Sequence, residues 1–184
     1  LERFTNRTFS EFNYYETIRS VNPAVVSITG KEWHLPKFEK DDLVPMLTGN
    51  GFMVYLRHHG FPSPLLDWTR SPYVAAFFAF RSPQVSKDGR VAIYSYVEQP
   101  GMGKFQDERS PMVYGTGAYV ESHKRHYAQQ CEYTICVKMV EGNHVYCSHE
   151  SAFEDKRSDQ GELRKFTLPA SERTKVLKQL QRMN

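Results

Sequence analysis

The spacing of hydrophobic residues predicts a helix near the start of the chain. Apolar and aromatic residues recur at near-helical intervals from Phe9, behind a capping pair formed by Thr8 and Glu11. We expect this helix to run to about Arg19 and to end before Pro23, because proline removes a helical hydrogen bond.

Two more helical patterns follow. One runs from Asp41 to about His59 and is interrupted at Gly49-Asn50-Gly51, which predicts two shorter helices. In the other, Ser71 is a good N-cap and Pro72 a good first helical residue. Its apolar, alanine-rich sequence predicts a mostly buried helix that lies close to a sheet.

Short apolar runs bounded by turn residues predict strands, mainly in the second half. Val91–Val97 is typical of an interior strand, and Tyr133–Val140 and His144–Ser148 of a hairpin. Arg164–Leu168 predicts the last strand, and Ser171 caps a closing amphipathic helix. Helices that precede most of the strands predict an α+β fold, with helices packed on a small mixed or antiparallel sheet in a single domain over residues 1–184.

Composition and charge narrow the class of protein. The chain is 40% hydrophobic and 14% aromatic, which is typical of a folded domain, and its net charge of +3 comes without a long basic run. No apolar stretch approaches the roughly 20 residues needed to span a membrane. Three cysteines, an odd number, argue against a disulfide framework and fit a reducing, cytoplasmic compartment.

The candidate chemistry concentrates between Arg57 and Ser71. The polar and aromatic side chains of this segment precede a helix N-terminus, whose free N–H groups favour an anion such as a phosphate. They are His58, His59, Asp67, Trp68, Thr69 and Arg70. The alternative is that these residues only form turns, caps and core.

A second candidate cluster lies at the start of the predicted hairpin. Gln130 and Glu132 are two residues apart, so on a strand they would share a face and bind one polar ligand. The alternative is a solvent-facing edge strand. His144, Cys147 and His149 lack a fourth ligand, so we expect no metal. The glycine-rich loop from Gln99 to Tyr119 is a candidate for a mobile segment that covers the site.

The segment from Arg57 to Phe80 resembles the best-preserved block of FRG domains, and Arg125 to Thr134 resembles a later block. The matching residues of the first block are His58, Gly60, Pro62, Leu65, Leu66, Asp67, Trp68, Thr69, Ala75, Phe78 and Ala79. The name-giving Phe-Arg-Gly is absent, and Arg57 stands where the family usually has Gln. The resemblance therefore implies an FRG-like domain that lacks its N-terminal segment and its C-terminal end.

A second resemblance links this layout to ADP-ribosyltransferases. Trp68 to Ala79 looks like their middle motif and Gln130-Cys131-Glu132 like their last. This implies an ADP-ribosyltransferase-like fold in a bacterial toxin or phage-defence protein that uses NAD as substrate. Such an enzyme would either transfer ADP-ribose to a protein or nucleic-acid target or hydrolyse NAD. The implied catalytic residues are Glu132, His58 and Thr69. The implied substrate-binding residues are Asp67, Trp68, Arg70, Tyr73 and Gln130.

Two other functions stay open. The same loop could serve a non-catalytic module that binds a nucleotide or nucleic acid, or it could be the core of a structural interaction domain.

Overall fold

The computed structural model describes residues 9–35, 50–81, 86–98, 110–116, 124–154 and 161–183. Within them, helices combine with two antiparallel sheets, which confirms the predicted α+β class. The sheets are a five-stranded one and a two-stranded one. The described residues include no helix with the length and apolar character that crossing a membrane requires.

The larger sheet is built around its longest strand, β5 (Cys131–Val140). Three strands pair with β5, all antiparallel: β2 (Leu66–Thr69), β4 (Met112–Gly115) and β6 (Asn143–Tyr146). The short β1 (Phe9–Ser10) pairs with β6. The predicted hairpin is confirmed, since β5 and β6 join through Glu141 and Gly142, both at positive φ (50° and 73°), as a tight hairpin turn requires.

The main core lies between this sheet and the two helices α2 (Glu11–Thr29) and α3 (Asn50–His58). Alternate residues of β5 point into it, since Tyr133, Ile135 and Val137 are all about 1% exposed or less. The helices contribute Tyr14, Ile18, Phe52, Met53, Val54 and Leu56. The core therefore anchors β2 and β5, and β2 lies at an edge of the sheet.

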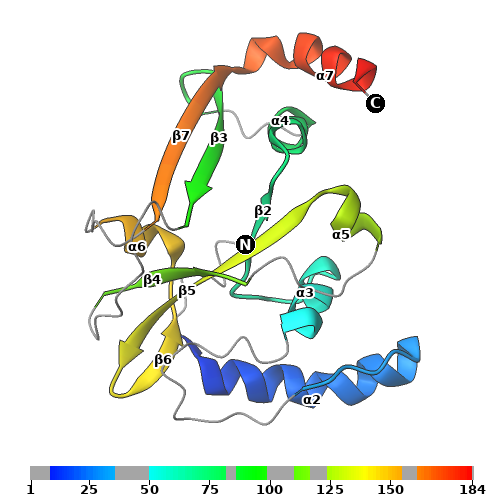
Figure 1. Ribbon diagram of the computed structural model, residues 1–184, viewed down its shortest axis with the longest axis vertical. Coiled ribbons are helices and arrows are strands. Elements are labelled where there is room, and N and C mark those ends of the chain that lie inside the picture. Colours follow the sequence, from blue (N-terminus) through cyan, green and yellow to red (C-terminus); the bar gives the residue numbers. More distant parts are fainter. Residues whose placement is uncertain are drawn as a thin grey trace.

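The smaller sheet consists of β3 (Arg90–Val97) and β7 (Glu162–Pro169). Helix α4 (Pro72–Arg81) packs on β3 and on α7 (Arg173–Arg182), which follows a 3₁₀ turn at Ala170–Glu172. Figure 1 shows β2 leading from the larger sheet up to α4, so this strand and helix connect the two sheets. Two short helices, α5 (Lys124–Ala128) and α6 (His149–Glu154), flank β5.

The first predicted helix is correct in place but wrong at both ends. Ser10, not Thr8, is its N-cap and accepts a hydrogen bond from the Asn13 N–H at 3.1 Å. The helix also continues through Pro23 to Thr29 and ends at Gly30 in the left-handed conformation. Proline costs one hydrogen bond here, and packing of the helix on both sides of it against the main core outweighs that loss.

Helix α4 begins as predicted, since the Ser71 hydroxyl accepts from the Val74 N–H at 3.3 Å. The prediction that it is mostly buried is wrong: only Phe80 is fully buried, and Phe77 and Phe78 are exposed. The reason is that β3 and α7 cover only part of its circumference. An apolar sequence indicates that a helix can be buried, but it does not show how much of the helix surface other elements cover.

Three further predictions, of a strand, a helix cap and a loop, also need correction. β3 is not an interior strand, because its only pairing among the described residues is with β7. Ser171 lies in the 3₁₀ turn, and α7 begins after it without a side-chain cap. The loop predicted over Gln99–Tyr119 contains β4, whose Met112 and Val113 are buried; residues 99–109 and 117–119 lie outside the described residues. Residues 41–49, which contain the first half of the second helical pattern, also lie outside the described residues. Helix α3 confirms the second half of that pattern.

Candidate functional site

A cleft of about 920 Å³ lies between the two sheets, within the size range of small-molecule sites. Strand β2 and the beginning of β5 line it on one side, and β3 and β7 on the other. The face of α4 that carries Val74, Ala75, Phe78 and Ala79 and the helix α6 complete its walls. The cleft thus collects side chains that are far apart in the sequence, with the predicted Arg57–Ser71 segment at its centre.

The polar end of the cleft is organised by an ion pair between Arg57 and Asp67. Arg57 Nε lies 2.6 Å from Asp67 Oδ1; the Arg57 side chain is 10% exposed and that of Asp67 52%. α3 therefore holds the arginine in place, and the arginine fixes a carboxylate that faces the open cleft. A carboxylate in this position can accept hydrogen bonds from ligand hydroxyls.

Beside this pair, His58 lines the cleft and connects to two buried groups. Its Nε2 lies 2.8 Å from the Tyr133 hydroxyl, which lies 3.0 Å from Nδ1 of the buried His126. Burial raises the pKa of Tyr133 well above its ordinary value, so the hydroxyl stays protonated. It can therefore donate to one imidazole and accept from the other, which fixes the orientation of His58 at the cleft.

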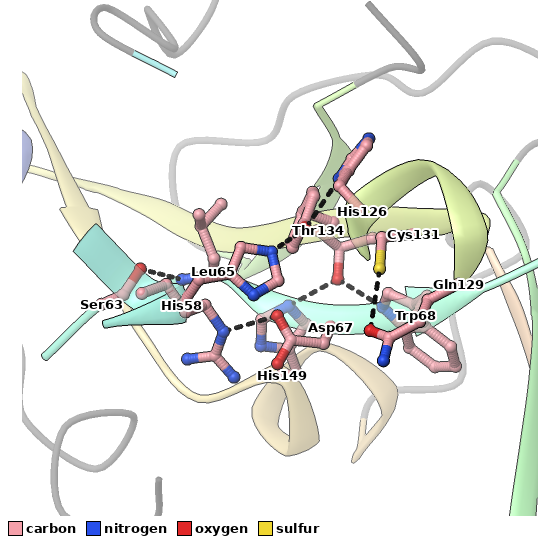
Figure 2. Close-up of polar contacts among 12 residues, drawn as sticks. His58, Ser63, Leu65, Asp67, Trp68, His126, Gln129, Cys131, Thr134 and His149 are labelled. Atoms are coloured by element: carbon pink, nitrogen blue, oxygen red, sulfur yellow. Dashed lines mark hydrogen bonds and ion pairs between the residues drawn. The ribbon is translucent and has the colours of Figure 1, made fainter. Parts of the chain in front are cut away.

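The aromatic end of the cleft is organised by the hydroxyl of Thr134. Trp68 Nε1 donates to Thr134 Oγ1 at 2.8 Å, and His149 Nε2 lies 2.9 Å from the same oxygen. Figure 2 shows Trp68 and His149 meeting at Thr134 from opposite sides. The indole ring also stacks on Tyr96 with 5.5 Å between ring centroids. Trp68 is thus held at its N–H and on one ring face, while it lines the cleft.

Gly161 allows Tyr96 to occupy its place behind Trp68. A Cβ atom at position 161 would lie 2.6 Å or less from three atoms of the Tyr96 side chain. Phe153 packs edge-on against the same tyrosine, with 5.9 Å between ring centroids. The tryptophan platform is therefore supported from behind by residues of β3, α6 and the start of β7.

We expect the stability of the chain to fall by about 2 kcal/mol between pH 7 and pH 5 through His149 alone. Burial lowers the pKa of His149 from 6.5 to about 4. Below pH 6.5 the unfolded chain therefore binds a proton that the folded chain excludes. This contribution is fully present above pH 6.5 and is lost as the pH falls towards 4.

Denaturant unfolding of the unchanged chain and of His149→Gln at pH 7 and pH 5 measures the loss of stability that is due to His149. The variant should lose about 2 kcal/mol less on acidification. His59→Gln, at an exposed histidine, is the control and should behave like the unchanged chain. Equal losses in the unchanged chain and in His149→Gln would show that His149 is not the group responsible.

The structure separates the predicted site residues into two groups. His58, Asp67, Trp68 and Thr69 line the cleft. The other four, Glu132, Arg70, Tyr73 and Gln130, are not among the described residues that line it. All four are sequence neighbours of cleft residues, and Tyr73 is 56% exposed near the start of α4.

Glu132 forms an ion pair with Arg70. It stands opposite Trp68 in the β2–β5 register, so it flanks the aromatic wall of the cleft. The expected common face of Gln130 and Glu132 is wrong, because β5 begins at Cys131 and Gln130 lies in a turn at φ 49°. The backbone carbonyl of Gln130 accepts from the Arg70 N–H at 3.0 Å.

Thr69 performs the turn role that the sequence left open as an alternative. Its hydroxyl donates to the Gln129 carbonyl at 2.7 Å and accepts from the Ser71 N–H at 3.1 Å. These bonds join the end of β2 to the turn before β5 and to the cap of α4. Thr69 therefore shapes the cleft, with its hydroxyl already occupied on both sides.

Sequence reasoning did not identify the roles of three residues that build the site. Arg57 pairs with Asp67, and Thr134 contacts both Trp68 and the third residue, His149. Arg57 belongs to the resembling block, but its role needs the ten-residue return of the chain to Asp67. Thr134 and His149 are 66 and 15 residues from their partners. A local sequence pattern cannot indicate such distant pairings, because these residues come together only in the folded chain.

The fold and the cleft define an α+β protein with a ligand-sized cleft between two antiparallel sheets. A sequence model of the FRG domain family matches residues 1–88, and the chain thus contains an FRG domain. The match includes β2, α3, α4 and the Arg57–Ser71 segment. Comparisons with curated proteins and with solved structures gave no match.

Proposed function

We propose that the cleft binds NAD and that the chain breaks the bond between nicotinamide and ribose. One observation carries the proposal: an aromatic platform and a carboxylate held by an arginine face the same cleft. Trp68 and Asp67 are consecutive on β2 and point to opposite faces of the strand, so a ligand that meets both must carry more than one unit of flat ring and hydroxyl-bearing sugar. NAD contains two such units.

The binding part of the proposal rests on Trp68 and Asp67. Trp68 lines the cleft and is already held by its stacking on Tyr96, so a base that stacks on the indole does not have to order it first. Asp67 keeps half of its side chain exposed although Arg57 holds one oxygen. Its remaining acceptor positions suit the hydroxyls of a ribose.

The catalytic part rests on a carboxylate next to the sugar. As nicotinamide leaves, positive charge develops on the ribose ring, and a nearby carboxylate stabilises that transition state more than the ground state. Glycosidases use carboxylates against a similar charge. Water, or a hydroxyl or amine of a target, then bonds to the anomeric carbon and gives up its proton. We assign the carboxylate to Asp67, because it lines the cleft, whereas Glu132 is turned to Arg70.

The second candidate function is a non-catalytic module that binds a nucleotide through the same cleft. The Arg70–Glu132 ion pair favours this second function. Glu132 is the catalytic carboxylate that the resemblance to ADP-ribosyltransferases implies, and Arg70 occupies it. Both functions predict binding, and only the first predicts release of nicotinamide. Incubating the chain with NAD and quantifying free nicotinamide by chromatography separates them. A chain that is stabilised by NAD but releases no nicotinamide would contradict the catalytic part.

Replacing Trp68 by Leu should weaken NAD binding by about 5- to 150-fold, since stacking of one base on an aromatic side chain contributes about 1–3 kcal/mol. The rise in melting temperature with increasing NAD concentration measures this change. Phe12→Leu, at an exposed aromatic residue of α2, is the control and should retain the full effect of NAD. Equal stabilisation of the Trp68→Leu chain would place the nucleotide elsewhere.

A further inference from the structure

Two of the three cysteines face each other across the β5–β6 hairpin, outside the cleft lining. The sulfur atoms of Cys136 and Cys147 are 3.4 Å apart, and no disulfide links them. The β5–β6 register pairs Val137 with Tyr146, and the Cys147 N–H continues it by donating to the Cys136 carbonyl at 2.9 Å. The two cysteines are thus direct neighbours on one face of adjacent chain segments.

This arrangement has the backbone geometry of a disulfide. Residues directly opposite each other in antiparallel strands have Cα atoms about 4.5–5.5 Å apart, within the range of about 4.4–6.8 Å found for disulfides. The sulfur atoms need only to approach each other by side-chain rotation. Cys131, the third cysteine, contacts Gln129 instead.

From this geometry we propose that Cys136 and Cys147 form a redox-active dithiol that hydrogen peroxide converts into an intramolecular disulfide. The two cysteines differ in access: Cys136 is 1% exposed, while Cys147 is half-buried and adjoins Ser148 at the start of the α6 segment. Hydrogen bonds from Cys136 and Ser151 and the positive charge of Lys138 lower the pKa of Cys147. Cys147 is therefore the more accessible thiol, and its lowered pKa favours the reactive thiolate form.

The reaction balances in two steps. The Cys147 thiolate attacks one oxygen of hydrogen peroxide, the O–O bond breaks, and the departing hydroxide takes a proton to become water, leaving a sulfenic acid. The Cys136 sulfur then attacks the Cys147 sulfur, and the S–OH bond breaks. The released hydroxide takes the Cys136 proton, so the dithiol is oxidised while peroxide is reduced to two molecules of water.

The disulfide would connect β5 to the segment that leads into α6. Cys136 lies two residues beyond Thr134 on the same face of β5, and Cys147 lies two residues before His149. The new bond would therefore run beside the Thr134–His149 contact of 2.9 Å. The dithiol itself does not depend on the proposed NAD chemistry.

Intact mass spectrometry of the full chain before and after hydrogen peroxide tests the proposal. The expected result is the loss of two hydrogen atoms, the loss of two alkylatable thiols after denaturation, and a non-reducing digest in which the Cys136 and Cys147 peptides are linked. Dithiothreitol should restore the original mass. Cys131→Ser should behave in the same way, whereas Cys136→Ser should stop at a sulfenic acid that dimedone traps on Cys147.

Three results would overturn the proposal: an unchanged mass, oxygen added to Cys147 while Cys136 stays alkylatable, or a link to Cys131. The digest of the unchanged chain decides between these results even if a substitution at the buried Cys136 prevents folding.

Discussion

An Asp67→Asn variant is expected to cleave NAD about 100- to 1000-fold more slowly than the unchanged chain, the loss typical when one electrostatic contact to a transition state is removed. The amide keeps an oxygen that Arg57 can bond, so the shape of the cleft persists. It loses the negative charge that opposes the positive charge on the ribose. We therefore expect kcat to fall much more than KM rises, measured by release of nicotinamide.

Two further variants make this result specific. Asp88→Asn removes the same charge from an exposed turn outside the cleft and should leave turnover unchanged. Glu132→Gln removes the carboxylate that pairs with Arg70. If Glu132→Gln loses turnover while Asp67→Asn keeps it, the catalytic carboxylate is Glu132, as the resemblance to ADP-ribosyltransferases implies. Melting curves of each variant separate lost chemistry from lost folding.

A Thr134→Val variant is expected to lower the free energy of unfolding by about 2–4 kcal/mol, because an unpaired buried polar group costs about 1–3 kcal/mol. Valine nearly matches threonine in shape, so no cavity forms. The change removes the oxygen that accepts from Trp68 Nε1 at 2.8 Å and contacts His149 Nε2 at 2.9 Å. Both groups would lose their partner where water cannot easily replace it.

Thermal unfolding measures this effect, with an expected fall in melting temperature on the order of 10 °C. Thr174→Val, on the exposed face of α7, is the matched control and should change stability by less than about 0.5 kcal/mol. A small effect at Thr134 would mean that Trp68 and His149 find other partners, and the tryptophan platform would then not depend on this hydroxyl.

The parts of the fold that depend on neighbouring residues could be predicted from the sequence. Ser71 and Pro72 begin α4, and Gly142 turns the β5–β6 hairpin, because a cap and a tight turn are local arrangements. Where local rules and tertiary packing compete, packing decides. α2 passes through Pro23 because residues on both sides of it, among them Ile18 and Val25, pack against the core.

The site could be predicted only in part, for the same reason. The Arg57–Ser71 segment was located because its polar and aromatic residues are close in sequence. Its chemistry depends on partners that the register of β2 and β5 supplies, such as Thr134 for Trp68. A single slip of that register would turn Trp68 to the opposite face. No sequence pattern shows that Arg70 holds Glu132 beside the cleft.

The most direct test of NAD binding in this cleft is a titration of the 5-fluorotryptophan-labelled chain with NAD, followed by fluorine NMR. The chain has two tryptophans, so each spectrum contains its own control. Trp68 lines the cleft, whereas Trp33 packs against Phe52 and Tyr55 at the α3 side of the main core. We predict a saturable shift of the Trp68 resonance, assigned with Trp68→Phe, while the Trp33 resonance stays in place. An unchanged Trp68 resonance at millimolar NAD would contradict the account.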